Sequence, residues 1–179
     1  EVPITSVTNG VHLPTWVNGD LALLYDQYLE PDWRERNHDP KVWEQIDEIP
    51  SSEIWEAHRR RKRRLVQFVR DRSVASAVAR QAPANEVRRV QEMFDPDVFT
   101  IGFARRFATY KRATLIFRDL DRLKKLMTNP KMPVQMIIAG KAHPKDTPGK
   151  GLIREIAQLS HDPDLANNLV FLEDYGIQV

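Results

Sequence analysis

The sequence predicts an α/β protein in which a parallel βαβαβ unit follows a mainly helical segment. Three short runs of apolar and β-branched residues, at 98–104, 134–139 and 169–172, have the composition of strands buried within a sheet. Stretches long enough for helices separate these runs, an order that favours right-handed crossovers between parallel strands. We therefore expect residues 97–179 to form a partial Rossmann-like unit. Residues 1–96 should form a helical segment that packs on this unit or links to it.

The composition is that of an ordinary globular chain and excludes several classes of protein. Of the 179 residues, 41% are hydrophobic and 29% are charged, and the formal net charge of +2 hides strong local clustering, so by itself it indicates nothing about partners. The sequence contains no cysteine, so it has neither a disulfide framework nor a thiolate metal site. The lack of cysteine fits a reducing cytoplasm, where we expect the protein to act. Since no apolar run approaches the length of a membrane span, we expect no membrane partner.

The N-terminal half is predicted to consist of helices joined by turns. Asn9-Gly10 favours a tight turn, because both residues tolerate a positive φ. Ser51 and Ser52 are good N-cap candidates for a long helix that should run to about Arg80, with acidic residues in its first turn. The remaining helices are expected over residues 21–29, 41–49 and 85–93, the last of them after Pro83.

Six consecutive basic residues, Arg59–Arg64, lie within the expected long helix. Such a run occurs in nucleic-acid-binding modules, and this alternative function belongs to a different class from an enzyme. However, the helical period distributes the six side chains around the cylinder, and no aromatic stacking residues accompany them. We interpret the run as a solvated helix face and expect no nucleic-acid partner.

The junction after the first expected strand carries the strongest indication of chemistry. Arg105, Arg106, Lys111 and Arg112 surround Tyr110, where the strand is expected to give way to a helix that begins near Lys111. In open α/β sheets this edge is where ligands bind. A guanidinium and an ammonium group suit an oxyanion such as phosphate, and cations at a helix N-terminus would need an anion to offset the macrodipole. Arg106 and Lys111 are therefore the first candidates for a phosphate site.

Other familiar site motifs are absent from the sequence. Neither of the glycine-rich phosphate loops, G-x-x-x-x-G-K-[ST] and G-x-G-x-x-G, occurs. The five histidines are scattered rather than spaced as metal ligands, and a serine nucleophile elbow is missing. These absences reduce the support for nucleotide hydrolysis, for dinucleotide-dependent redox chemistry and for a metal centre.

Four blocks of the sequence resemble the α-glucan (glycogen/maltodextrin) phosphorylases, and their residues are most similar to those of the shorter bacterial and archaeal type. These blocks are T-N-G-V-H-L-P-T-W, G-F-A-R-R-F-A-T-Y-K-R, I-I-A-G-K-A-H-P and F-L-E-D-Y, and they occur in the family's order. The resemblance implies a glycosyltransferase-B fold, of which residues 97–179 would be part of the C-terminal domain. It also implies reversible phosphorolysis of an α-1,4-glucan by inorganic phosphate, which yields glucose 1-phosphate, with pyridoxal 5′-phosphate as the cofactor.

The resemblance also assigns roles to individual residues. It implies that Arg106 holds the substrate phosphate, that Arg105 faces the cofactor's phosphate and that Lys111 lies close to both. Asn9 and Tyr110 would contact the glucosyl unit, and Tyr175 would pack near the cofactor ring. Two phosphate groups pressed together need several cations, which agrees with the basic junction described above.

The sequence departs from the family's better-known members in ways that limit these expectations. Ala108 and Thr109 stand where the animal and plant enzymes have His and Glu, and Gly176 stands where they have an Arg near the cofactor. The family's cofactor-linking lysine should lie beyond Val179, so we expect an internal fragment that is inactive alone. A sugar-nucleotide glycosyltransferase of the same fold is the alternative enzyme, and a homo-oligomer is compatible with either function.

Overall fold

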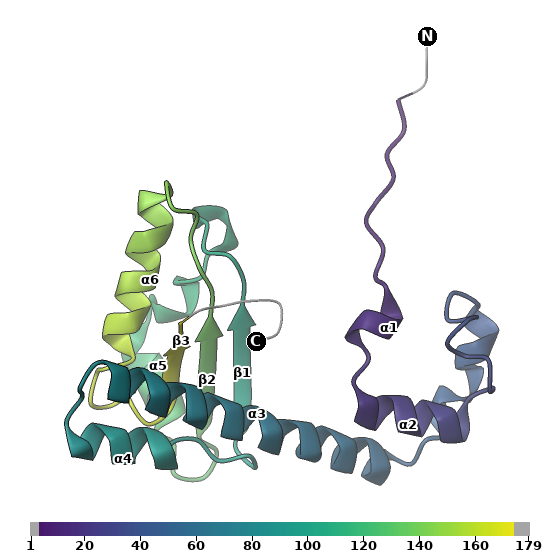
Figure 1. Ribbon diagram of the computed structural model, residues 1–179, viewed down its shortest axis with the longest axis horizontal. Helices are drawn as coiled ribbons and strands as arrows, with labels where there is room; N and C mark the ends of the chain where they lie inside the picture. Colours follow the sequence, from purple (N-terminus) through teal and green to yellow (C-terminus); the bar gives the residue numbers. More distant parts are fainter. Residues whose placement is uncertain (1–3, 174–179) are drawn as a thin grey trace. The chain divides into compact units, whose positions relative to one another are not determined.

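The computed structural model describes residues 4–173, and the chain divides into two compact units, residues 1–62 and 63–179 (Figure 1). The first unit contains α1 (Leu13–Trp16), α2 (Gly19–Tyr28) and the 3-10 helix η1 (Pro40–Glu48). The long helix α3 (Ser51–Ala79) starts in the first unit and continues into the second. No helix among residues 4–173 is both long and apolar enough to cross a membrane. The predicted domain boundary after residue 96 stays a prediction.

The first unit has its own small aromatic core. Trp33 is only 1% exposed, and its ring meets Tyr25 and Trp43 edge-on, with centroids 5.2 Å and 6.2 Å away. The indole N–H of Trp33 donates to a carboxylate oxygen of Asp26 at 2.9 Å, so the buried ring leaves no polar atom unpaired. The helices predicted at 21–29 and 41–49 are both present, the second as a 3-10 helix.

Helix α3 confirms the predicted long helix but not its predicted cap. The backbone N–H groups of Glu53 and Ile54 both donate to the carbonyl oxygen of Pro50, which therefore accepts the first hydrogen bonds of the helix. Ser51 and Ser52 lie in the first turn rather than at the N-cap, so the N-cap prediction for these two serines is wrong. A proline fits the position before a helix, because it has no backbone N–H to donate and only its carbonyl oxygen is used there.

The second unit confirms the predicted parallel βαβαβ arrangement. Strands β1 (Phe99–Ala104), β2 (Val134–Ala139) and β3 (Leu169–Leu172) form one sheet in the order β1-β2-β3, and the three arrows point the same way in Figure 1. The bounds of β2 and β3 are those predicted, because short buried β-branched runs between turn residues leave little choice of register. Helices α5 (Leu120–Met127) and α6 (Thr147–Leu159) lie in the two crossovers.

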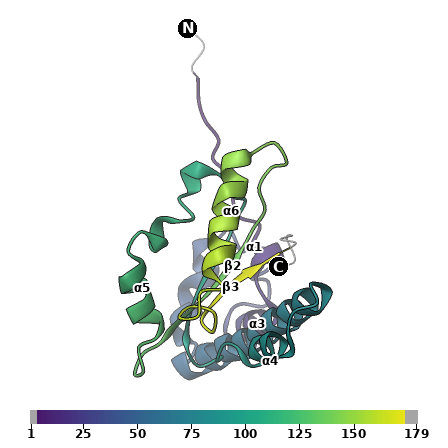
Figure 2. The same cartoon turned by 90° about the vertical axis from the view of Figure 1, so that its left-hand side faces the viewer.

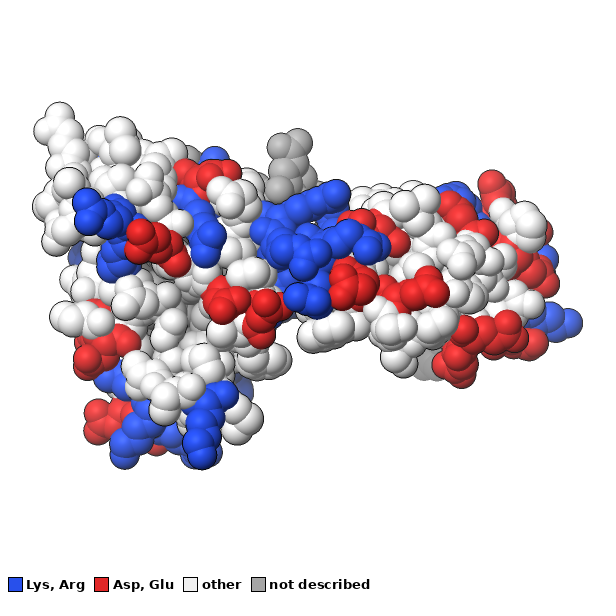
Figure 3. All heavy atoms as spheres, turned by 90° about the horizontal axis from the view of Figure 1, so that it is seen from below, with Lys and Arg blue, Asp and Glu red and all other residues white. Residues whose placement is uncertain are grey.

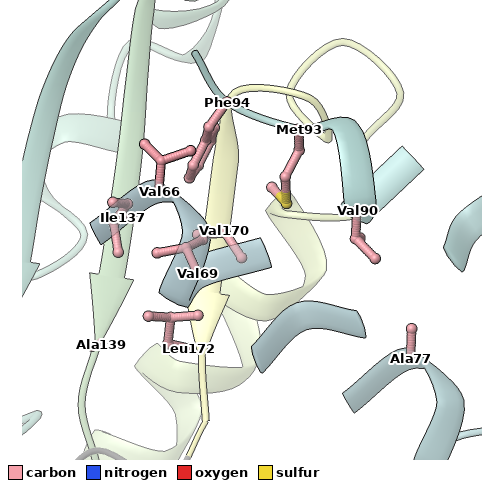
Figure 4. Packing of buried hydrophobic residues seen from close by; sticks show 10 residues of the cluster. All are labelled: Val66, Val69, Ala77, Val90, Met93, Phe94, Ile137, Ala139, Val170 and Leu172. Carbon is pink, nitrogen blue, oxygen red and sulfur yellow. The ribbon is translucent and has the colours of Figure 1, made fainter. Parts of the chain in front are cut away.

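Each face of the sheet packs against a different set of helices. On one face Ile137, Ala139, Val170 and Leu172 meet apolar residues of α3 and of the segment that contains α4 (Ala84–Glu92), as Figure 4 shows. The alternate residues of the strands form the second core, with α5, α6 and the loops before them; Figure 2 shows these elements and the strands from another side. The members of this second core that come from β2 and β3 include Met136, Ile138 and Leu169. The alternation is the period of two that a strand imposes, and it produces a three-layer α/β/α unit.

Strand β1 differs from the expectation that it is buried on both faces. Phe99 is 67% exposed, Gly102 and Ala104 are exposed as well, and the other residues of the strand are only partly buried. The reason is that β1 is an edge strand of the described sheet and pairs only with β2. Ile101 and Phe103 pack into the core on one face, whereas Gly102 offers nothing to bury on the other.

One buried polar side chain fixes the turn that leads into β1. Gln135 on β2 is 1% exposed, and its amide nitrogen donates to the carbonyl oxygen of Asp95 and to the hydroxyl of Thr100, each at 2.8 Å. Its amide oxygen accepts the backbone N–H of Asp95 at 2.9 Å. A buried amide that makes three hydrogen bonds offsets its own desolvation, so Gln135 links β2 to the turn without a net cost of burial.

An ion pair between α5 and the loop before β3 should make stability depend on pH. The Lys124 ammonium contacts carboxylate oxygens of both Asp162 and Asp164 at 2.9 Å, and its hydrogen bond to Asp162 holds the pKa of that carboxyl below its ordinary value. A carboxyl whose pKa is lowered in the folded state stabilises the fold at pH values above its unfolded-state pKa. This stabilisation is lost as the pH falls through the folded-state pKa. We therefore expect the thermal midpoint of the natural chain to exceed that of Lys124→Met at neutral pH. The two midpoints should converge only once the pH has fallen below the lowered, folded-state pKa of Asp162, and a difference that persists at still lower pH would contradict the assignment.

Candidate functional site

The carboxyl ends of the three strands lie at one level, and the candidate site is built on this edge. Ala104, Ala139 and Leu172 are the last residues of their strands and are aligned in the sheet register. The residues that follow them therefore emerge at the same edge. Arg105 and Arg106 follow β1, and Gly140 and Lys141 follow β2.

The first two strands stay connected beyond the end of the sheet. The backbone N–H of Arg105 donates to the carbonyl oxygen of Ala139 at 3.1 Å, and that of Phe107 donates to the carbonyl oxygen of Lys141 at 2.9 Å. These two hydrogen bonds continue the parallel ladder into both loops. As a result, the main chain that carries Arg105 and Arg106 runs beside the main chain that carries Lys141.

The helix expected to begin near Lys111 does not form there. Two short 3-10 turns, η2 (Thr109–Lys111) and η3 (Leu115–Phe117), come first, and α5 begins only at Leu120. Arg112 ends η2 with a φ of 52°, a left-handed conformation that a helix cannot contain. Asp119 then caps α5 by accepting the N–H of Arg122 at 3.0 Å. The basic junction is thus a turn rather than a helix N-terminus, and the macrodipole argument does not apply to it.

The cations of this edge are available to a ligand. Arg105 and Arg106 are exposed, Lys111 is half-buried, and within residues 4–173 none of the three forms an ion pair. The ammonium nitrogen of Lys111 lies 5.5 Å from the ring centroid of Tyr110, which is itself 76% exposed. Two guanidinium groups and an ammonium group without an acidic partner in the described part of the chain suit an anion with several oxygens.

Other candidate residues lie elsewhere in the chain or outside its described part. Asn9 is exposed in the first unit, and neither it nor Gly10 lies in a turn or has a positive φ, so the tight turn expected there is wrong. Tyr175 lies outside the described residues. Two hollows of the second unit, of about 460 and 390 Å³, are lined by residues of other segments. The roles of Asn9, Arg105, Arg106, Tyr110, Lys111 and Tyr175 therefore stay predictions.

Sequence reasoning did not assign a role to the loop after β2. Lys141 is exposed and adds a further cation to the same edge of the sheet, held there by its backbone bond to Phe107. The signal was present, because Lys141 is the second residue after a buried strand, the same place that Arg106 occupies after β1. Within residues 4–173, no group of three or more metal-ligating side chains occurs.

The basic run Arg59–Arg64 lies on helix α3 as predicted, and Figure 3 shows Lys and Arg side chains gathered there next to acidic ones. Arg59 contacts Glu56 at 3.1 Å, one turn earlier in the helix. Arg60 and Arg61 contact the Asp20 carboxylate at 3.2 and 3.6 Å. Arg59, Arg60 and Arg61 therefore have acidic partners within the protein, as expected of an ion-paired helix face.

Over its whole length, the chain is similar in sequence to one group of enzymes. The chain is 44% identical over 175 residues to a glycogen phosphorylase of Aquifex aeolicus, a match that covers 98% of the chain and 25% of that relative. It is 39% identical over 180 residues to a maltodextrin phosphorylase of Thermococcus litoralis, covering 99% of the chain and 21% of the relative. A glycogen phosphorylase of Mycobacterium tuberculosis is 38% identical over 179 residues, which cover all of the chain and 20% of the relative.

The chain thus spans about a fifth to a quarter of the length of these relatives. No family model matches it. The resemblance that the four sequence blocks indicated is confirmed by these relatives, which are bacterial and archaeal.

Proposed function

This chain is related along its whole length to one segment of the glycogen and maltodextrin phosphorylases, and on that premise we propose that it contributes the phosphate-binding edge of an α-glucan phosphorylase. The whole protein would catalyse the reversible phosphorolysis of an α-1,4-glucan to glucose 1-phosphate. The single observation that carries the proposal is the group of cations at the carboxyl edge of the sheet. Arg105, Arg106 and Lys111 follow β1 there without an acidic partner in residues 4–173.

The charges of this edge fit two phosphate groups rather than one. A substrate phosphate and the phosphate of pyridoxal 5′-phosphate together carry several negative charges, and bringing them into contact requires cations from more than one residue. Arg106 would hold the substrate phosphate, Arg105 would face the cofactor's phosphate and Lys111 would lie between them. Lys141, at the end of β2, adds a fourth cation to the set. The donors present therefore fit the phosphate of this cofactor.

The chain's own residues would act by positioning and by charge neutralisation. When bound, the cofactor supplies a phosphate group that can exchange a proton with the substrate phosphate. Arg106 orients the attacking oxygen towards the anomeric carbon, and Lys111 neutralises the charge shared by the two phosphates. Tyr110 and Asn9 would contact the glucosyl unit, and Tyr175 would pack near the cofactor ring. The half-buried position of Lys111 strengthens its effect, because a partly desolvated charge is screened less by water.

Two other functions receive less support. A sugar-nucleotide glycosyltransferase of the same fold would also need cations at this edge, but the relatives reported above are named phosphorylases. A nucleic-acid-binding module would use Arg59–Arg64, but Arg59, Arg60 and Arg61 already contact acidic side chains. We propose that the protein acts in the cytoplasm, where glucan and inorganic phosphate are both present.

The test of the proposed function uses the whole protein from which this chain derives. We expect it to release glucose 1-phosphate from an α-1,4-glucan only when inorganic phosphate is present, and to show the absorbance of a bound pyridoxal group. The 179-residue chain alone should release none. Transfer from a sugar nucleotide with no dependence on phosphate would instead support the glycosyltransferase, and a protein without the pyridoxal absorbance would overturn the proposal.

A further inference from the structure

Phe107 is the one fully buried residue of the basic segment, residues 105–110. Its side chain is 2% exposed, and its ring packs against Phe103 of β1 and Phe171 of β3, with centroids 6.1 Å and 6.0 Å away. Its neighbours Arg105 and Arg106 are exposed. The buried ring is therefore the side-chain attachment by which an otherwise exposed loop is fixed to the core of the sheet.

Gly140, the first residue after β2, leaves room for this loop because it has no side chain. A Cβ atom at position 140 would lie 2.6 Å from one ring carbon of Phe107 and closer still to a second ring carbon and to the carbonyl oxygen of Arg105. Real Cβ atoms do not approach that closely, and the oxygen belongs to the backbone, so it cannot turn aside. The φ of Gly140 is not positive, so glycine is required here for space and not for backbone conformation.

Gly149 in α6 leaves space for the backbone of Phe107, as Gly140 does for its ring. A Cβ atom there would lie 2.8 Å from the carbonyl oxygen of Phe107 and 2.8 Å from a carboxylate oxygen of Asp146. Asp146 caps α6 by accepting the N–H of Gly149 at 2.9 Å. The absence of a side chain at position 149 thus allows the first turn of α6 to touch the backbone of Phe107.

We infer that Phe107, held between Gly140 and Gly149, sets the position of the guanidinium groups of Arg105 and Arg106. The three are positioning residues of the phosphate site, and the inference rests on the proposed function. The backbone bonds of Arg105 to Ala139 and of Phe107 to Lys141 fix the ends of the same short segment. Any side chain at position 140 must displace the carbonyl of Arg105, and a displacement of about 1 Å can lower a rate by about a hundredfold.

The experiment compares Phe107→Leu and Gly140→Ala in the whole protein. Both should raise the KM for inorganic phosphate and its calorimetric Kd by about ten- to a hundredfold, while the KM for glucan stays within about twofold. Phe107→Leu leaves Gly140 and its backbone contacts unchanged, so it remains informative if Gly140→Ala does not fold.

Two control variants separate positioning from loss of stability. Gly151→Ala also adds a methyl group to a glycine near this loop, but nothing lies within 4 Å of the Cβ that it adds. Leu165→Ala truncates a fully buried residue of the same core, before β3 and hence at the opposite edge of the sheet. Neither control should change the KM or Kd for phosphate, although Leu165→Ala should lower the thermal midpoint.

The outcomes distinguish this inference from the proposed function. If the unaltered protein neither binds phosphate nor releases glucose 1-phosphate, the proposed function fails. If the unaltered protein does both, but Phe107→Leu changes phosphate binding no more than Leu165→Ala does, the proposed function stands and the positioning role is refuted. An equal rise of the KM for glucan in Phe107→Leu would likewise refute a role confined to phosphate.

Discussion

Replacing Arg106 or Lys111 by alanine in the whole protein should weaken its use of inorganic phosphate by about 2–4 kcal/mol of transition-state stabilisation. This corresponds to a loss of about 30- to 900-fold in kcat/KM for phosphate. The reason is that each side chain lacks an acidic partner in residues 4–173, so its charge is available to the ligand. Initial rates measured at limiting phosphate and saturating glucan give the effect directly.

Matched controls remove a charge of the same kind from elsewhere in the second unit. Arg88 is exposed on α4, and Lys131 is exposed in the loop before β2, at the amino edge of the sheet. Arg88→Ala and Lys131→Ala should change kcat/KM for phosphate by less than about twofold, since long-range surface charges are screened by salt. Rates near those of the unaltered protein in Arg106→Ala would refute the phosphate role of that arginine.

Replacing Trp33 by alanine should destabilise the first unit by about 3–5 kcal/mol. Trp33 is 1% exposed at the centre of a cluster with Tyr25 and Trp43, and truncation removes its ring contacts and leaves a cavity. It also removes the indole donor to Asp26, whose pKa is lowered first by its bond to Arg34 and then by that to Trp33. Thermal or urea unfolding followed by tryptophan fluorescence measures the loss.

Trp55→Ala is the matched control for this second prediction. Trp55 is a tryptophan of the same unit but is 58% exposed on α3, where its ring stacks on His58. Its removal should cost less than about 1 kcal/mol, as for a surface substitution. A similar loss of stability in both variants would show that the cluster around Trp33 does not form the core of the unit.

The strands and most helices could be predicted because their signal is local. The runs V-Q-M-I-I-A and L-V-F-L are too short and too apolar for another arrangement between their flanking turns, and the structure gives β2 and β3 these same bounds. The prediction of a helix beginning near Lys111 was wrong, although Ile116, Leu120 and Leu123 have helical spacing. There the left-handed φ of Arg112 and the cap at Asp119 divide the segment, and neither feature has a strong signal in the apolar pattern.

The candidate site was predicted in part. Arg105, Arg106 and Lys111 could be selected from their types and from their place after a strand, because the carboxyl edge of a parallel sheet is the same edge for every strand. What could not be predicted is which loop lies against them. Gly140 is 35 residues beyond Arg105 in the sequence, and the register that brings Gly140 and Lys141 beside Arg105 exists only in the folded sheet.

The sequence by itself determined the fold class, the bounds of β2 and β3 and the resemblance to glucan phosphorylases, because composition, periodicity and short motifs are properties of neighbouring residues. Only the tertiary structure decided that Phe107 is buried between two glycines from separate segments, that β1 is a partly exposed edge and that the basic residues follow a turn instead of starting a helix. These features depend on contacts between residues far apart in the chain. Steric exclusion and burial act on such contacts only once the layers have packed.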